Sequence, residues 1–378
     1  MKKKSVYKLI VGAIFFSILG GTAQGTRQGI PLINAHDLVL DGVVLDGSGI
    51  SIAIIDEGID VTHPQLGGSS SCSESAWIND KVIGGWDFGQ LDNRKGDSLP
   101  CDSLRGGHGT RVAGIAAGLA TENGGDYWGG VATGAKLYSL NLSRKNGRYG
   151  AFALRDSLIW VNQHWNDDPD NPIKIVLLTG NYHDVEYNQF NANDQTVYEN
   201  CDHLPKDKSW QSQFESLNSK GIVVISSSGN YGDKGGGSPG FRNGVDWPAC
   251  LSSVNAVSAI DDTGNPITVD EQSDLGEFTA LLAPGSTTRT TYPGNTFRNF
   301  GDTSAAAPYA AGAAAVLQSA SLRITNRYMN PEDLISALQK YGTLITDKRK
   351  GSVGIKKPLI NLRATIEGTF SVKLDTPR

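Results

Sequence analysis

A serine stands where a polar turn runs into an alanine-rich segment. The turn ends at Thr303, the serine is Ser304, and small residues continue to Ala320. A serine at the start of a helix commonly caps backbone N–H groups with its side-chain oxygen. It can also act as a nucleophile, because the N–H groups and the helix dipole at that position would stabilise an oxyanion. The nucleophilic interpretation requires a base, and an acid that orients the base, elsewhere in the chain.

Asp56 and His108 are the candidates for these two roles. Asp56 follows the apolar run 49–55, which predicts a buried strand, and open α/β sheets place their sites at the carboxyl ends of such strands. His108 enters a segment of small residues, up to Gly118, that predicts a helix packed closely on a sheet. Each residue also has an ordinary structural interpretation, the aspartate as a turn or cap residue and the histidine as a surface or capping residue. With its usual pKa of about 6.5, an imidazole can accept a proton from serine near neutral pH.

Predicted strands and helices alternate along the rest of the chain. The strands are predicted at 136–142, 173–179, 222–226, 254–260 and 278–283, and the helices at 152–165, 208–219 and 331–341. Asn330 caps the last helix and Pro331 occupies its first position. This alternation predicts a three-layer α/β fold, with a mostly parallel central sheet and helices on both faces. Residues 67–107 are predicted to form a long polar insertion.

The first 25 residues predict a secretory signal peptide. Lysines at positions 2–4 precede an apolar run at 9–19, and small residues follow. A membrane anchor is the alternative, but the run is too short to span a bilayer, and no later segment is long and apolar enough. We therefore expect a secreted or periplasmic protein without stable membrane association. After the signal peptide we predict a short segment at 26–40, a catalytic domain at 41–368 and a tail at 369–378.

Composition indicates what kind of protein this is and which partners and metal sites are not expected. With 39% hydrophobic and 19% charged residues the chain can bury a large core, and its net charge of -5 gives no reason to expect nucleic acid as a partner. The four cysteines fit an oxidising compartment. Three pairings are open, and we prefer the one with the shortest loops, Cys72–Cys101 and Cys201–Cys250. No spacing of cysteine or histidine predicts a zinc site. We expect a monomer.

Four segments resemble motifs of the subtilisin-like serine peptidases. They lie at 54–58, 108–114, 228–230 and 303–308, and they place Asp56, His108 and Ser304 in the order that subtilisin has. The resemblance covers roughly residues 41–368. Each motif is weak alone, but four in the right order, each at a predicted strand or helix end, make a specific signal.

The resemblance implies a subtilisin-like fold and an exported serine endopeptidase that acts on protein or peptide substrates. It assigns Ser304 as nucleophile, His108 as base and Asp56 as the acid that orients the base. Asn230 and the backbone N–H of Ser304 would form the oxyanion hole of an acyl-enzyme reaction. No cofactor is certain; calcium is possible, since family members often bind it, but no ligands can be matched here.

The sequence also departs from the family pattern. Ala305 replaces a methionine, and Asp302 replaces a glycine. The segment that lines the specificity pocket is altered, so Leu178, Thr179 and Gly180, with Gly229, are substrate-binding candidates without a predicted preference. Two alternatives follow: a subtilisin-fold binding protein with little or no catalysis, and an esterase. We expect the Asp302 carboxylate to point towards water, because an inward charge would repel the oxyanion.

Overall fold

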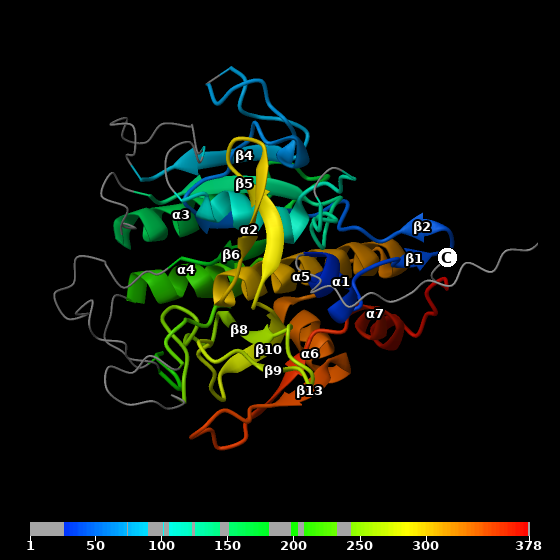
Figure 1. Ribbon diagram of the computed structural model, residues 1–378. Coiled ribbons are helices and arrows are strands. Elements are labelled where there is room, and N and C mark those ends of the chain that lie inside the picture. The colour runs from blue at the N-terminus through cyan, green and yellow to red at the C-terminus, as the bar shows by residue number, and fades with distance from the viewer. Residues whose placement is uncertain are drawn as a thin grey trace, which may run out of the picture.

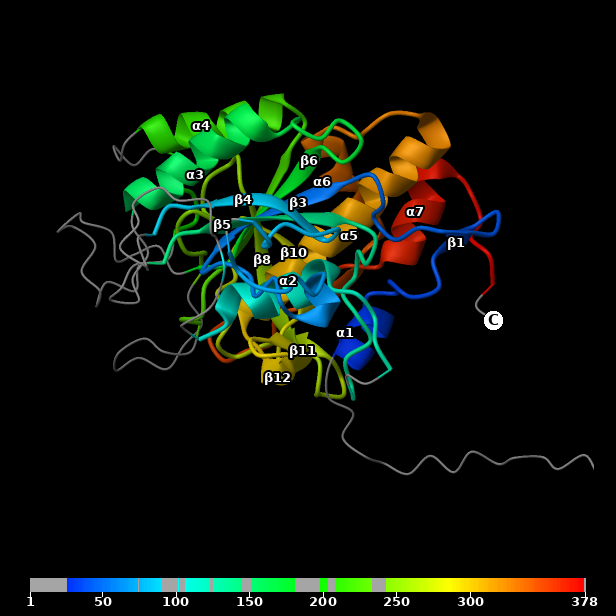
Figure 2. The same ribbon diagram turned by 90° about the horizontal axis from the view of Figure 1, so that it is seen from above.

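The structure is a computed structural model. It describes residues 26–73, 75–89, 101, 106–122, 125–143, 151–180, 198–202, 208–232 and 243–376. The predicted signal peptide at 1–25 lies outside the described residues. A central sheet runs through the molecule and helices cover both of its faces (Figure 1 and Figure 2). This confirms the predicted α/β architecture.

The central sheet is mostly parallel. In spatial order its strands are β13 (Thr343–Thr346), β14 (Lys356–Leu359), β10 (Thr279–Pro284), β8 (Asn255–Asp261), β7 (Val223–Ser227), β6 (Ile173–Leu178), β3 (Ser51–Asp56), β5 (Lys136–Asn141) and β4 (Val82–Asp87). The neighbours from β14 to β4 are parallel. The short β9 (Thr268–Val269) pairs with β8, and β13 with β14, in antiparallel fashion. Strands β3, β5, β6, β7, β8 and β10 lie within one or two residues of their predicted bounds.

Strand β3 lies inside the sheet and divides the core in two. All six of its residues are buried. Ile52 and Ile54 pack into one hydrophobic cluster, and Ala53 and Ile55 pack into the other. Successive side chains of a strand point to opposite faces, so a strand covered on both faces is apolar at successive positions, here from Ile52 to Ile55. This is why the apolar run is continuous in the sequence, and Asp56 is the last residue of the strand.

Helices α3 (Ala151–His164) and α4 (Lys208–Ser219) cover one face of the sheet (Figure 2). The other face carries α2 (His108–Ala117) and α5 (Thr303–Thr325), joined by α6 (Pro331–Tyr341) and α7 (Leu362–Phe370). The small residues of α2 and α5 let the two backbones approach closely. A Cβ added at Gly312 would lie 2.6 Å from the carbonyl oxygen of Ala116. The first turns of both helices lie at one pocket, which His108 and Ser304 line.

The interpretation of 67–107 as one long polar insertion was wrong in one part. Strand β4 lies inside it and pairs with β5 at the edge of the sheet. The sequence did not predict this strand, because Gly84 and Gly85 lie in its middle and glycine is unfavourable inside strands. They are needed for close packing: a Cβ at Gly84 would lie 2.4 Å from the Tyr138 ring, and one at Gly85 would lie 2.0 Å from the Ser139 carbonyl oxygen.

A hairpin of β11 (Thr288–Tyr292) and β12 (Thr296–Phe300) leads directly into α5 and was not predicted. At the N-terminal side, α1 (Thr26–Leu32) and a small hairpin of β1 (Val39–Leu40) and β2 (Val43–Val44) precede the sheet. A one-turn 3-10 helix, η1 (Pro64–Leu66), follows β3. The N-terminal segment packs against α7, where the Leu362 N–H donates to the Ile33 carbonyl oxygen at 2.8 Å.

Both predicted disulfides are confirmed. The Cα atoms are 6.3 Å apart in Cys72–Cys101 and 5.4 Å apart in Cys201–Cys250, within the range a disulfide bridges. The second bridge ties the segment before α4 to the turn before β8. Among the helices of the described residues, none has both the length and the apolar character needed to cross a membrane.

Candidate active site

The candidate residues lie together at the carboxyl edge of the sheet. Asp56 ends β3, Thr179 follows β6, and Asn230 follows β7 within a few residues. Parallel strands all end at one edge, which is where open α/β sheets form their sites. His108 and Ser304 lie in the first turns of α2 and α5, and they enter the same pocket as Thr179 and Asn230.

Asp56 holds the ring of His108. Nδ1 of His108 lies 2.9 Å from each carboxylate oxygen of Asp56, which is only 1% exposed. The Glu57 N–H donates to Oδ1 at 2.7 Å, and the Thr179 hydroxyl donates to Oδ2. Burial alone would raise the pKa of Asp56, but the charge of His108 and these hydrogen bonds outweigh it and lower the pKa. The carboxylate is therefore ionised at neutral pH and fixes the orientation of the imidazole.

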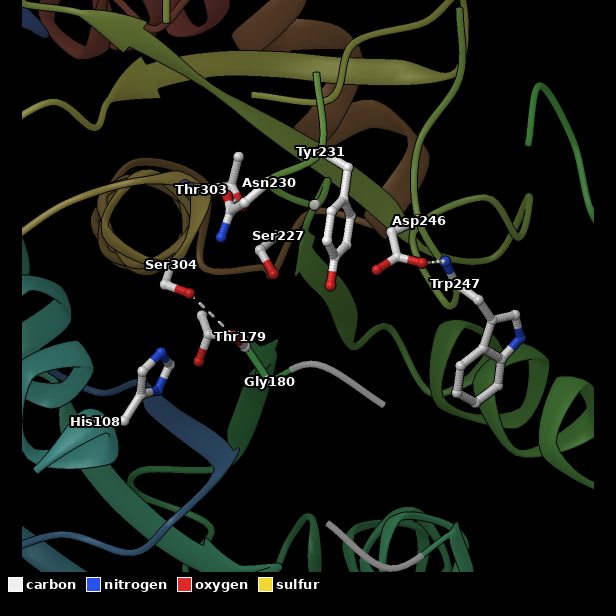
Figure 3. Close-up of a pocket in the computed structure, with 11 residues that line it drawn as sticks. His108, Thr179, Gly180, Ser227, Asn230, Tyr231, Asp246, Trp247, Thr303 and Ser304 are labelled. Atoms are coloured by element: carbon white, nitrogen blue, oxygen red, sulfur yellow. Dashed lines mark hydrogen bonds between the residues drawn. The ribbon is translucent and has the colours of Figure 1, made fainter. Parts of the chain in front are cut away.

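Ser304 faces the same ring from the start of α5. Figure 3 shows the His108 ring facing the Ser304 hydroxyl. That hydroxyl donates to the Thr179 carbonyl oxygen at 3.2 Å, and the hydrogen bonds of the described residues include none between His108 and Ser304. A serine hydroxyl reorients by rotation about one bond, and catalytic hydrogen bonds often tighten only when substrate is bound. The contact between the two side chains stays a prediction.

Asn230 is fixed by the residue before Ser304. Its Oδ1 accepts from the Thr303 N–H at 3.0 Å and from the Thr303 hydroxyl at 2.6 Å. This leaves the amide nitrogen pointing into the pocket (Figure 3). The N–H of Ser304 belongs to the first turn of α5, where no intrahelical acceptor exists. The Asn230 amide nitrogen and the Ser304 N–H are therefore the candidate donors next to the Ser304 hydroxyl.

The pocket beside Ser304 has a volume of about 270 Å³. It is lined by His108, Thr179, Gly180, Ser227, Gly229, Asn230, Tyr231, Asp246, Trp247, Thr303 and Ser304. Of the four substrate-binding candidates, three line it, and Leu178 does not. The side chain of Leu178 is fully buried in the core on the α3 side, as strand alternation requires.

Sequence reasoning missed Ser227, Tyr231, Asp246 and Trp247. Ser227 and Tyr231 flank the predicted oxyanion motif, so proximity in sequence could have indicated them. Asp246 and Trp247 lie in the turn that precedes β8, and no local pattern marks that turn as part of a site. Thr179 had been a pocket candidate only, yet it also bonds to Asp56 and to Ser304.

The described part of the chain contains no cluster of side chains suited to bind a metal ion. No three histidine, cysteine, aspartate or glutamate side chains there could jointly hold an ion. Calcium usually takes six to eight oxygen ligands, several of them carboxylates. The possibility of calcium therefore stays a prediction without assigned ligands.

Asp302 has a backbone conformation that suits glycine. Its φ is 61° and its ψ is -167°, and the residue is exposed. Residues with a Cβ are rarely found in this region, and each such case costs about 1–3 kcal/mol. The conformation gives a physical reason for the glycine in the motif that this segment resembles, and the exposure agrees with a carboxylate that faces water.

We expect Asp302→Gly to stabilise the protein by about 1 kcal/mol, because relief of strain exceeds the entropy that glycine adds to the unfolded chain. Asp302→Asn removes the charge but keeps the Cβ, so it should leave the urea midpoint nearly unchanged. Both variants should change kcat/KM on one peptide by less than about tenfold. Equal stabilisation by the two variants would assign the cost to charge rather than to strain.

The fold and the site together define a class. A mostly parallel α/β sheet that brings an aspartate, a histidine and a serine to its carboxyl edge is the architecture of a serine hydrolase. The family model of the subtilases matches residues 47–351, and the chain belongs to the subtilase family. It is a serine endopeptidase by class.

Individual relatives agree with this assignment. The chain is 30% identical to subtilisin DY of Bacillus licheniformis over 297 residues, covering 79% of this chain and 86% of that protein. It is 27% identical to thermitase of Thermoactinomyces vulgaris over 300 residues, covering 79% and 86%. It is 26% identical to subtilisin Savinase of Lederbergia lenta over 328 residues, covering 85% and 96%.

Proposed function

We propose that Asp56, His108 and Ser304 form a catalytic triad that hydrolyses peptide bonds through an acyl-enzyme. The observation that carries the proposal is the buried Asp56 carboxylate, held 2.9 Å from Nδ1 of a histidine that faces Ser304. Asn230 Nδ2 and the Ser304 N–H are proposed as the oxyanion hole.

In the first half-reaction, Nε2 of His108 takes the proton of the Ser304 hydroxyl while Oγ attacks the scissile carbonyl carbon. The carbonyl oxygen becomes an oxyanion and accepts hydrogen bonds from Asn230 and the Ser304 N–H. Asp56 stabilises the imidazolium without taking its proton. The imidazolium then protonates the leaving amine, and the C–N bond breaks.

In the second half-reaction, a water molecule replaces the amine. Nε2 of His108 takes one water proton while the oxygen attacks the acyl carbon, and the oxyanion forms again in the same hole. The proton returns to Oγ of Ser304 as the ester bond breaks, which releases the carboxylic acid and restores the enzyme. Thr179 helps to hold Asp56 throughout, because its hydroxyl donates to the carboxylate.

Labelling with a fluorophosphonate probe tests this proposal. The probe phosphonylates only an activated serine, so wild type should be labelled and Ser304→Ala should not. No labelling of correctly folded wild type would favour the alternative of a subtilisin-fold binding protein. Turnover of ester but not of matched peptide substrates would favour the esterase alternative.

The pH profile should report the pKa of His108. Burial alone would lower this pKa, but Asp56, and to a smaller extent Glu57, outweigh it, so the pKa is raised above its usual value of 6.5. The base must be neutral, so kcat/KM should rise with pH along a limb whose midpoint lies above 6.5. Glu57→Gln removes one of the negative charges and should move the midpoint to lower pH. A midpoint that stays fixed in Glu57→Gln would contradict this electrostatic account.

We also propose that the protein is exported. The N-terminal 25 residues have the layout of a secretory signal peptide, and both disulfides fit an oxidising compartment. Amino-terminal sequencing of the protein recovered outside the cytoplasm tests this, with cleavage expected after residue 23 or 25. Retention of the full N-terminus in the cytoplasm would contradict export.

A further inference from the structure

A row of aromatic rings and guanidinium groups runs from the His108 ring along the hairpin of β11 and β12. The Phe300 ring meets the His108 ring edge-on, with the centroids 5.1 Å apart. Cζ of Arg111 lies 4.5 Å from the Phe300 centroid and 5.7 Å from the Tyr292 centroid. Cζ of Arg298 lies 3.8 Å from the same Tyr292 centroid. We call Phe300, Arg111, Tyr292 and Arg298 the arginine row, and none of the four lines the pocket described above.

Strand register places the hairpin's part of the row on one face. Residue 288 is paired with 300, 290 with 298, and 292 with 296. Side chains of antiparallel partners point to the same side, and positions two apart on a strand share a face. Tyr292, Arg298 and Phe300 therefore lie on one face of the hairpin, whereas Arg289, which is paired with residue 299, lies on the other.

Hydrogen bonds hold Arg111 against this face. Figure 2 shows the hairpin beside α2, and the Thr290 hydroxyl donates to the Arg111 carbonyl oxygen at 2.8 Å. The guanidinium of Arg111 donates to the carbonyl oxygens of Gly107 at 3.2 Å and of Gly106 at 2.8 Å. A guanidinium that is held in this way and covered by rings loses little conformational entropy when it binds a ligand.

The positive charge of the row is not balanced by the described part of the chain. The ion pairs among the described residues include neither Arg111 nor Arg298. Burial raises the pKa of Glu57 despite the charge of Arg111 nearby, so Glu57 is not a strong partner of that arginine. Two guanidinium groups against one tyrosine ring repel each other, and a carboxylate bound between them would relieve the repulsion.

The row lies on the side of the catalytic residues from which the amine product would leave. In the proposed reaction the amine nitrogen takes its proton from Nε2 of His108, so the part of the substrate after the scissile bond starts at that ring. Figure 3 shows Asn230 on the opposite side of Ser304 from His108. Phe300 contacts the His108 ring, and an extended peptide advances about 3.3 Å per residue. The second and third residues after the scissile bond would therefore pass along the arginine row.

We propose that Arg111 and Arg298 make this peptidase prefer an acidic side chain two or three residues after the scissile bond. The inference rests on the proposed function of Ser304, because it concerns the part of the substrate that leaves as the amine. The substrate carboxylate accepts hydrogen bonds from the planar guanidinium groups, a geometry in which arginine and carboxylate match each other. A neutral side chain at the same place leaves the two positive charges unbalanced.

The test compares fluorogenic peptides that differ only at the second or the third position after the scissile bond, which is glutamate, glutamine or lysine. At one of these positions wild type should cleave the glutamate peptide with kcat/KM about tenfold above the glutamine peptide, and the lysine peptide more slowly than either. Added salt should reduce the ratio of glutamate to glutamine cleavage, because it screens exposed charges. A ratio near one at both positions in wild type would overturn the proposal.

Variants of the two arginines test the contact itself. Arg298→Gln removes an exposed charge that lies against Tyr292 rather than against the catalytic histidine. It should reduce the ratio to about threefold or less and leave the glutamine peptide within a fewfold of wild type. Arg111→Gln should also reduce the ratio. Its position near His108 affects both peptides alike, so the ratio still reports the contact with the acidic side chain.

Arg289→Gln is the matched control. It removes the same charge from the same hairpin, but Arg289 lies on the other face. The ratio of glutamate to glutamine cleavage should stay that of wild type. An equal fall of this ratio in Arg289→Gln and Arg298→Gln would assign the preference to net charge and contradict the proposed contact.

Two further measurements keep the outcomes distinct. Mass spectrometry of a denatured protein digested by wild type needs no variant, and aspartate and glutamate should be enriched at the second or third position of the new amino termini. Fluorophosphonate labelling of the same preparation separates this inference from the proposed function. A labelled and active enzyme without the acidic preference contradicts only the role of the two arginines, whereas an unlabelled and inactive enzyme contradicts the function of Ser304.

Discussion

Replacing Ser304 with alanine should lower kcat for amide hydrolysis by about 10⁶-fold, a magnitude taken from subtilisin. The reason is that, among the described residues that line the pocket, Ser304 is the one whose hydroxyl lies at a helix N-terminus and faces the His108 ring. His108→Ala should cost about as much, since an unactivated serine is a weak nucleophile. The double variant should be no worse than either single variant, because the two groups act as a unit. Initial rates on a chromogenic peptide measure all three.

Ser319→Ala provides the matched control. Ser319 lies in the same helix α5 but bonds to the Ser48 carbonyl oxygen, outside the pocket. It should retain the activity of wild type, and thermal unfolding should show that Ser304→Ala is folded. Activity of Ser304→Ala above about 1% of wild type would mean that another group acts as nucleophile.

Replacing Asn230 with alanine should lower kcat by about 10²–10³ with little change in KM, again a magnitude taken from subtilisin. The amide nitrogen would meet the carbonyl oxygen only after that oxygen becomes charged, so the loss falls on the transition state rather than on substrate binding. Steady-state kinetics that separate kcat from KM are the required measurement.

Two variants separate donation by Asn230 from its structural bonds. Asn230→Asp keeps an oxygen that accepts from Thr303 but replaces the donor with a negative charge, so its kcat should fall at least as far as that of Asn230→Ala. Thr303→Val removes one of the two bonds that orient the amide, the 2.6 Å bond from the hydroxyl, and should give a much smaller loss. A loss confined to KM in Asn230→Ala would show that this residue only binds substrate.

Much of the fold follows from patterns within single segments. From Ile52 to Ile55 the strand before Asp56 is apolar at every position because β3 is covered on both faces. The small residues after His108 and Ser304 indicate helices that pack closely, and α6 begins at the predicted cap and ends where expected. Such signals are local, so a single sequence carries them. Strand β4 was not predicted, because its glycines are explained only by close packing against β5. That strand lies about fifty residues further along the chain.

By itself the sequence determined the residues proposed to react, their order, and the strand and helix ends on which they stand. It also supported the disulfide pairs, because short loops are the easiest to close. Tertiary structure alone decided how Thr179 and Thr303 support Asp56 and Asn230, and that Asp246 enters the pocket of Ser304. Those contacts depend on strand register and on where separate turns meet at one edge of the sheet. No local periodicity encodes the distance between residues such as Asp246 and Ser304, which only the packed chain brings to the same pocket.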